Sequence, residues 1–158
     1  MFRPLSRREK ELSREECLVL LKSQKRGVLC VNGDGGYPYG MPMNPWYDQA
    51  TGKLYFHCGT EGHRVDALRA DDRVCFCTND EGECPSDGWA KTVKSVIAFG
   101  RVAFVRDPKR IEEITAKLSR KFTSDEEYIR REIEAFAHRT LLLEMTIEHL
   151  CGKRVQEA

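Results

Sequence analysis

The sequence predicts a mainly β fold, a closed or nearly closed antiparallel barrel of about six strands with few helices. Two observations lead to this prediction. Apolar runs are separated by the turn-type segments NGDGG and DQATG, and such turns connect antiparallel strands. The regular alternation of strand and helix that builds a parallel nucleotide-binding sheet is absent. An open sheet of this size would leave an unpaired edge, which closure of the barrel removes.

The first half of the chain is predicted to form a helix, a three-stranded meander, a second helix and a fourth strand. Ser13 and Glu16 have the spacing of a capping box, which starts a helix. The glycine-rich turns then separate the three strands of the meander. The expected elements are a helix over 14–24, strands near 27–32, 38–47 and 53–58, a helix over 61–69 and a strand near 73–78. The polar segment EGECPSDG follows as a loop.

The second half is predicted to form a long strand, two helices and a closing strand. Residues 93–105 are β-branched and apolar on both faces, so one face fills the barrel and the other needs a cover. Helices are expected over 108–122 and over 125–138, the latter with a capping box of Ser124 and Glu127. Alternating residues predict a strand over 140–150. The expected buried stripes of the two helices are Ile111, Ile114, Leu118 and Phe122, and Ile129, Ile133, Phe136 and Ala137.

Composition bounds the class of protein. The 158 residues suit one domain, and 41% hydrophobic with 32% charged residues indicates neither disorder nor a membrane protein. No apolar run approaches the roughly 18 residues that a bilayer demands. The start, MFRPLSRREKELS, lacks the apolar stretch of a signal peptide, so we expect a cytoplasmic protein. Residues 1–12 are expected to form a basic tail that is flexible or contacts a partner.

Charge and cysteine usage exclude further classes. The two ends of the chain are mildly basic and residues 27–90 are acidic, which is not typical of nucleic-acid-binding proteins. The 7 cysteines are an odd number among apolar neighbours, so we expect reduced thiols that pack as small apolar side chains. Two cysteines of the segment CFC share one face of a strand without the tight turn of a zinc knuckle. We therefore expect no metal site.

A candidate anion site lies in KLYFHCGTEGHR, where a strand ends and a helix begins. His57, Thr60, His63 and Arg64 are expected to converge there with the free amides of the helix N-terminus. A purely structural alternative stays open, in which Thr60 caps the helix while His63 and Arg64 are solvated on its first turn. Cys58 follows His57 directly, but neighbours in a strand point to opposite faces, so the two do not form a nucleophilic pair.

A second candidate is the proline-rich segment YPYGMPMNPWY. Its prolines, which remove ladder donors, leave backbone groups around Met41, Met43 and Asn44 free for a flat heteroaromatic ligand with donors and acceptors at its edge. Met and Trp side chains offer polarizable surface beside them. The alternative is an edge strand that its prolines protect from aggregation.

Together these segments resemble a known family, the FMN-binding split barrels of the pyridoxamine 5'-phosphate oxidase type, and more closely their nitroimidazole-resistance-like branch. The similarity covers nearly the whole chain. It is carried by RGVLCVNGDGGYPYGMPMNPWYD, YFHCGTEGHRVDAL, VKSVIAFGRVAFV, DPKR and IEHLCGK. The resemblance implies a six-stranded antiparallel split β-barrel with peripheral helices, in which flavin lies in the groove of a homodimer. The doubly apolar strand 93–105 also favours a dimer, because a monomer would leave one apolar face in water.

The resemblance also implies a cofactor and site residues. FMN is expected, with FAD possible. Met41, Pro42, Met43 and Asn44 correspond to the strand that borders the flavin ring, and His57, Cys58, Thr60, His63 and Arg64 to the phosphate segment. His57 is the best catalytic candidate. The family's basic substrate-binding residues near the C-terminus have no clear match, because Lys153 and Arg154 lie in a short tail.

The expected activity is FMN-dependent reduction of a small organic acceptor, such as a nitroaromatic compound, with NAD(P)H as electron donor. The alternative is a flavin- or haem-binding module without turnover. Neither a nucleic acid nor a membrane is expected as a partner.

Overall fold

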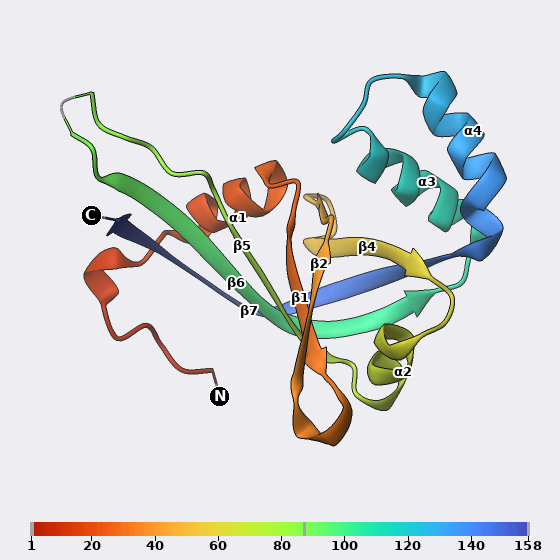
Figure 1. Cartoon of the computed structure of the whole chain (residues 1–158), viewed down its shortest axis with the longest axis horizontal. Helices are drawn as coiled ribbons and strands as arrows, with labels where there is room; N and C mark the ends of the chain where they lie inside the picture. Colours follow the sequence, from red (N-terminus) through yellow and green to blue (C-terminus); the bar gives the residue numbers. More distant parts are fainter. Residues whose placement is uncertain (1, 87, 158) are drawn as a thin grey trace.

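Figure 1 shows a computed structural model of the chain, which describes residues 2–86 and 88–157. The described residues form one antiparallel sheet of seven strands in the order β2-β1-β5-β6-β7-β4-β3, with β2 and β3 at its edges. The sheet curves into a split barrel, which confirms the predicted fold class, but it does not close, and the expected six strands are seven. The strands are β1 (Gly27–Asn32), β2 (Pro38–Met43), β3 (Trp46–Asp48), β4 (Lys53–Gly59), β5 (Arg73–Asn79), β6 (Lys91–Val105) and β7 (Thr140–Glu157).

The extra strand arises because the expected strand over 38–47 is divided. β2 ends at Met43 and pairs with β1, whereas β3 begins at Trp46 and pairs with β4 at the opposite edge. Asn44 and Pro45 connect the two strands. Proline has no N–H to continue a ladder, so the chain leaves one edge of the sheet there and joins the other.

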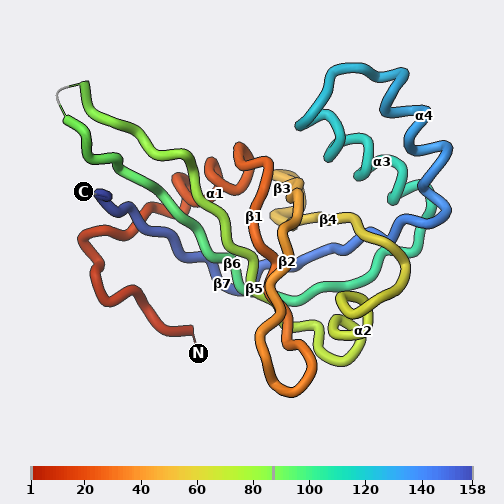
Figure 2. The backbone as a smooth tube through the Cα atoms, in the orientation of Figure 1, coloured from red at the N-terminus to blue at the C-terminus, as the bar shows by residue number. Residues whose placement is uncertain are grey.

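The hairpin of β6 and β7 is longer than predicted. β6 starts two residues early, and β7 continues to Glu157 instead of ending at residue 150. The two strands pair from Lys91 with Glu157 to Val105 with Leu142, with one bulge between Phe99 and Gly100. Figure 2 shows the far end of this hairpin extending away from the rest of the sheet, beside the C-terminus. The segment KRVQE carries little apolar alternation, so its pattern did not indicate a strand.

Helices cover the sheet at separate places. They are α1 (Arg14–Ser23), α2 (His63–Ala70), α3 (Pro108–Ser119) and α4 (Glu126–Phe136), with short 3-10 turns η1 (Arg8–Lys10), η2 (Asp34–Gly36) and η3 (Ala137–Arg139). α1 has the predicted capping box of Ser13 and Glu16. The predicted box of Ser124 and Glu127 is wrong, because Asp125 caps α4 by accepting from the amide of Tyr128 at 2.9 Å.

The main core lies between the inner face of the sheet and helices α1 and α2. Its fully buried members include Leu21, Leu29, Leu54, Phe56, Phe76, Val96, Leu143 and Met145. A smaller core forms on the outer face of β4 and β7, where Ile111 and Ile114 of α3 pack on Tyr55 and Leu142. Phe122 was expected on the same buried stripe of α3, but it lies beyond the helix end and is 41% exposed.

The N-terminal residues, expected as a flexible or partner-contacting tail, lie along β7. The amide of Leu12 donates to the carbonyl of Gly152 at 2.9 Å, and the ring of Phe2 stacks on His149 with centroids 4.8 Å apart. Among residues 2–86 and 88–157, no helix has both the length and the apolar character needed to cross a membrane.

Candidate functional site

β4 presents successive side chains to opposite faces of the sheet. Phe56 and Cys58 are buried on the inner face, whereas Tyr55 and His57 point to the outer face beneath α3 and α4. This is the period-2 alternation of a strand. The prediction that His57 and Cys58 do not meet is therefore confirmed.

One cavity, of about 240 Å³, lies where β4 ends and α2 begins. We call it the α2 cavity. It is lined by Tyr39, Cys58, Gly59, Glu61, Gly62, His63, Arg64 and Val65. Gly62 is the N-cap residue and has a φ of 109°, a conformation that favours glycine, and no side chain caps this helix. The amides of His63 and Arg64 consequently have no intrahelical acceptor, and they carry the partial positive charge of the helix N-terminus.

Arg64 supplies the full positive charge of the α2 cavity. Its side chain is half-buried, and its Nε donates to the Sδ atom of Met41 at 2.9 Å. Among the described residues no carboxylate lies within 4.0 Å of this guanidinium. The one acidic residue that lines the cavity, Glu61, is exposed. A half-buried cation without a carboxylate partner is suited to bind an external anion.

His63 fixes the start of α2 against the β1–β2 hairpin. Its ring stacks on Tyr39, with centroids 4.3 Å apart and an interplanar angle of 11°. Its Nε2 lies 3.4 Å from the carboxylate of Asp34. The imidazole thus lines the cavity while it holds the hairpin in place.

The structure brings together only part of the predicted anion cluster. His63 and Arg64 line the α2 cavity, whereas Thr60 is exposed in the turn after β4 and does not line it. The alternative in which Thr60 caps α2 is wrong, because Gly62 occupies the N-cap. His57 lies on the other face of β4, so the predicted convergence of all four side chains is not found.

The thiol and imidazole of β4 have shifted pKa values. Burial raises the pKa of Cys58, against the opposing effect of the Arg64 guanidinium. Burial lowers the pKa of His57, and the positive charge of Arg64 lowers it further. At neutral pH the thiol is protonated and the imidazole is uncharged.

The proline-rich segment forms the edge strand β2. The side chains of Met41 and Met43 are 2% and 6% exposed and belong to the core, so they do not offer the expected surface to a ligand. Pro42 is exposed and Asn44 is half-buried. Because β2 pairs only with β1, the backbone groups on its other edge are unpaired in the sheet. Contact with a ligand at this strand would therefore go through the backbone and Asn44.

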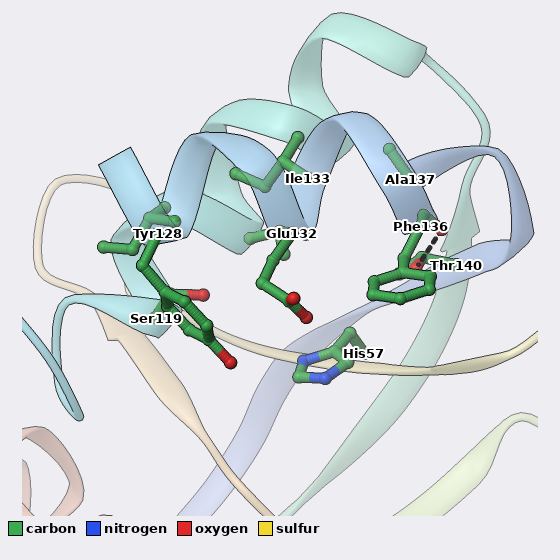
Figure 3. Close-up of a pocket in the computed structure, with 10 residues that line it drawn as sticks. His57, Ser119, Tyr128, Glu132, Ile133, Phe136, Ala137 and Thr140 are labelled. Carbon is green, nitrogen blue, oxygen red and sulfur yellow. Dashed lines mark hydrogen bonds between the residues drawn. The ribbon is translucent and has the colours of Figure 1, made fainter. Parts of the chain in front are cut away.

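A second cavity, of about 220 Å³, lies on the outer face of β4 beneath α4 (Figure 3). We call it the α4 cavity. It is lined by His57, Thr115, Ser119, Tyr128, Ile129, Glu132, Ile133, Phe136, Ala137 and Thr140. The sequence predicts a buried stripe in α4, yet only Ile129 of that stripe is buried. The sequence pattern does not separate a cavity wall from a core, because both need apolar residues at helical spacing.

The outer side of the sheet carries a surface that we call the apolar face. Paired residues across the strands form two rows, Cys30, Cys75, Phe99 and His149, and Val28, Cys77, Ile97 and Cys151. Directly opposed residues point to the same side of a sheet. Val28 is 39% exposed and the other seven are half-buried, and the Phe2 ring covers only the end of the face at Phe99 and His149. No group of three or more metal-ligating side chains occurs in the described part of the chain.

Comparison with known proteins identifies relatives over nearly the whole chain. A family model described as pyridoxamine 5'-phosphate oxidase matches residues 13–154. No curated protein matches the sequence.

Several solved structures share the fold. A proposed 5-nitroimidazole antibiotic resistance protein from Bacteroides thetaiotaomicron is 17% identical, with a TM-score of 0.76 over 93% of this chain and 87% of that chain. A FAD-binding protein from Mesorhizobium loti is 23% identical, with a TM-score of 0.65 over 92% and 97% of the two chains. A flavocytochrome from Azotobacter vinelandii is 16% identical, with a TM-score of 0.76 over 94% and 71%. At these identities the likeness shows a common fold.

Proposed function

The chain belongs to the pyridoxamine 5'-phosphate oxidase family, and from this premise we propose that it is a flavin-dependent oxidoreductase acting on a small organic acceptor. The observation that carries the proposal is the α2 cavity, where the Arg64 guanidinium has no carboxylate partner among the described residues. Two solved structures of the same fold are a FAD-binding protein and a flavocytochrome, which supports a flavin as the ligand.

The residues of the α2 cavity fit the phosphate of FMN. Arg64 would donate charge-assisted hydrogen bonds to the phosphate, and the amides of His63 and Arg64 would donate from the helix N-terminus. A Cβ atom built at Gly59 has no heavy atom within 4 Å, so the backbone there is open to a ligand. FAD carries a phosphate at the same position, esterified to AMP, and is the alternative cofactor.

The edge of β2 is the proposed border of the flavin ring. It is joined to the phosphate site through the contact between Met41 and Arg64. Its unpaired backbone groups and the half-buried Asn44 amide would bond the polar edge of the ring system. Bound flavin supplies hydride transfer from NAD(P)H and on to an acceptor such as a nitroaromatic compound.

His57 is the proposed catalytic residue on the acceptor side. Its uncharged imidazole, with one donor and one acceptor nitrogen, can bind an acceptor without placing a positive charge beside it. Oxidation of pyridoxamine phosphate is not part of the proposal. Arg154, one of two basic residues near the C-terminus, is already paired with Glu16 at 2.8 Å.

A homodimer is the proposed assembly. The apolar face is only half-buried in one chain, and a two-fold contact would cover it with its own copy. The flavin would then lie in the groove between the two copies, within reach of residues from both.

The proposed activity is tested anaerobically with flavin-loaded protein. Addition of NADH or NADPH should bleach the visible absorbance of the flavin, and a nitroaromatic compound should restore it in repeated cycles. If neither nicotinamide bleaches the flavin, and photochemically reduced protein reoxidises with nitroaromatics no faster than free FMN, the protein is a binding module without turnover.

A further inference from the structure

The α4 cavity contains polar side chains for which the described chain provides no partner. The Oγ1 atom of Thr115 is buried and makes no hydrogen bond. Glu132 forms no ion pair within 4.0 Å among the described residues, and Figure 3 shows its carboxylate directed toward the His57 ring. Thr140 is the contrasting case, because its hydroxyl donates to the carbonyl of Phe136 at 2.8 Å. The buried Thr115 hydroxyl is the group that lacks a partner and calls for a bound molecule, whereas Glu132 and His57 are exposed at the mouth of the cavity.

The charge of the α4 cavity restricts the ligand. Glu132 is the only carboxylate among the residues that line the cavity. The other ionisable side chains there are the Tyr128 phenol and the His57 imidazole, and the lowered pKa of His57 favours its uncharged form at neutral pH. The cavity is therefore negative. It favours a cation with N–H donors, because a carboxylate and a neutral imidazole can both accept hydrogen bonds from them. It disfavours anions.

The shape of the cavity restricts the ligand further. Its volume of about 220 Å³ is below the roughly 300 Å³ at which pockets for drug-sized ligands begin, so it suits one small ring with a short substituent. Ile129, Ile133 and Phe136 line it on the α4 side. Arg139 stacks on the Phe136 ring, 4.4 Å from its centroid, and holds that ring in place. An aromatic ring can pack on such a wall.

We propose that the α4 cavity is a binding site for a small planar aromatic cation of the amidine or guanidine type, held through Glu132 and His57. The N–H pair of such a cation matches a carboxylate in bidentate geometry, as an arginine side chain does. The hydroxyl of Thr115 supplies a further acceptor at depth. The site shares His57 with the proposed acceptor site, but it lies on the opposite face of β4 from the α2 cavity, so binding of the cation can be tested without flavin.

The experiment uses three probes of nearly identical shape and different charge. Benzamidine is the cation, benzamide the neutral isostere and benzoate the anion, each titrated calorimetrically into the full-length protein. We expect benzamidine to bind at least about tenfold more tightly than benzamide, as a charge-assisted bond provides, and benzoate not to bind. Absence of benzamidine binding, or equal affinity for benzoate, would overturn the proposal.

Matched variants locate the binding. Glu132→Gln should abolish the preference for benzamidine over benzamide, whereas Glu134→Gln, on the same helix and paired with Arg130 at 2.8 Å, should leave it unchanged. Thr115→Val should weaken benzamidine binding without lowering the unfolding free energy, because the hydroxyl it removes is unpaired. A preference that survives Glu132→Gln contradicts the assignment. FMN titrations of the same variants should be unchanged, so failure here is distinct from failure of the flavin site.

Discussion

Replacement of Arg64 by methionine should weaken FMN binding and spare riboflavin. FMN and riboflavin share the ring system, but only FMN carries a phosphate. The Arg64→Met substitution keeps an apolar stem beside Met41 and removes the positive charge from the α2 cavity. The difference between the two ligands therefore isolates the contact between guanidinium and phosphate.

The magnitude follows from the environment of Arg64. The side chain is half-buried and has no carboxylate partner among the described residues, so its charge is neither fully screened nor already neutralised. A hydrogen bond to a charged group contributes about 1.5–3 kcal/mol. At about 1.4 kcal/mol for each factor of ten, the dissociation constant for FMN should rise roughly 10- to 150-fold. The dissociation constant for riboflavin should change less than about fivefold, since riboflavin has no phosphate and any remaining effect of the lost charge is at most about 1 kcal/mol.

The assay is quenching of flavin fluorescence as apo protein is added. Glu61→Gln provides a control of opposite sign, because it removes the negative charge that lines the same cavity and should tighten FMN binding while riboflavin is unaffected. Higher salt should reduce both effects. If Arg64→Met weakened FMN and riboflavin equally, the phosphate assignment would be refuted.

Three further predictions concern the assembly and the stability of the fold. Ile97→Glu places a charge in the apolar face and should convert the proposed dimer into a monomer by light scattering; a wild-type protein that is monomeric with flavin bound contradicts the dimer. Glu144→Gln should lower the unfolding free energy at pH 7 by about 1–3 kcal/mol. Burial raises the pKa of Glu144, but hydrogen bonds from its neighbours, first of all Lys53, lower it by more, so the carboxylate stabilises the fold above pH 4.5 and this contribution is lost as pH falls. A urea-unfolding difference that is the same at pH 3 and pH 7 would contradict this. Gly100→Ala would place a Cβ against the backbone carbonyl of Thr146 at the bulge and should lower the free energy of unfolding in urea by at least about 2 kcal/mol. An unchanged urea midpoint would contradict this, because it would mean that the backbone shifts at no cost to make room for the methyl group.

Much of the fold could be predicted from local signals. The capping box of Ser13 and Glu16 placed α1, and glycine-rich turns placed the hairpins, because both signals act through neighbouring residues. Ser124 and Asp125 are both good N-caps, and the sequence did not show that Asp125 would be chosen. The division of residues 38–47 depends on β2 and β3 pairing with different strands, which is a property of the whole sheet.

The candidate site was also predicted only where its residues are neighbours in the sequence. His63 and Arg64 follow a strand end within a few residues, so their place at one cavity could be expected. The α4 cavity joins His57 to Thr115 and Glu132 across a long separation in sequence, and no local pattern relates them. The side chains of Met41 and Met43 turned inward because alternation in β2 places them on the core face.

The visible absorption spectrum of the purified protein tests the central claim, flavin binding, most directly. The account predicts the two absorption bands of an oxidised flavin, either as purified or after reconstitution with FMN and removal of the unbound cofactor. Denaturation should release the flavin unmodified, since the proposed contacts are non-covalent. A protein that remains colourless after incubation with FMN and with FAD, or that shows only the Soret band of a haem, would contradict the account.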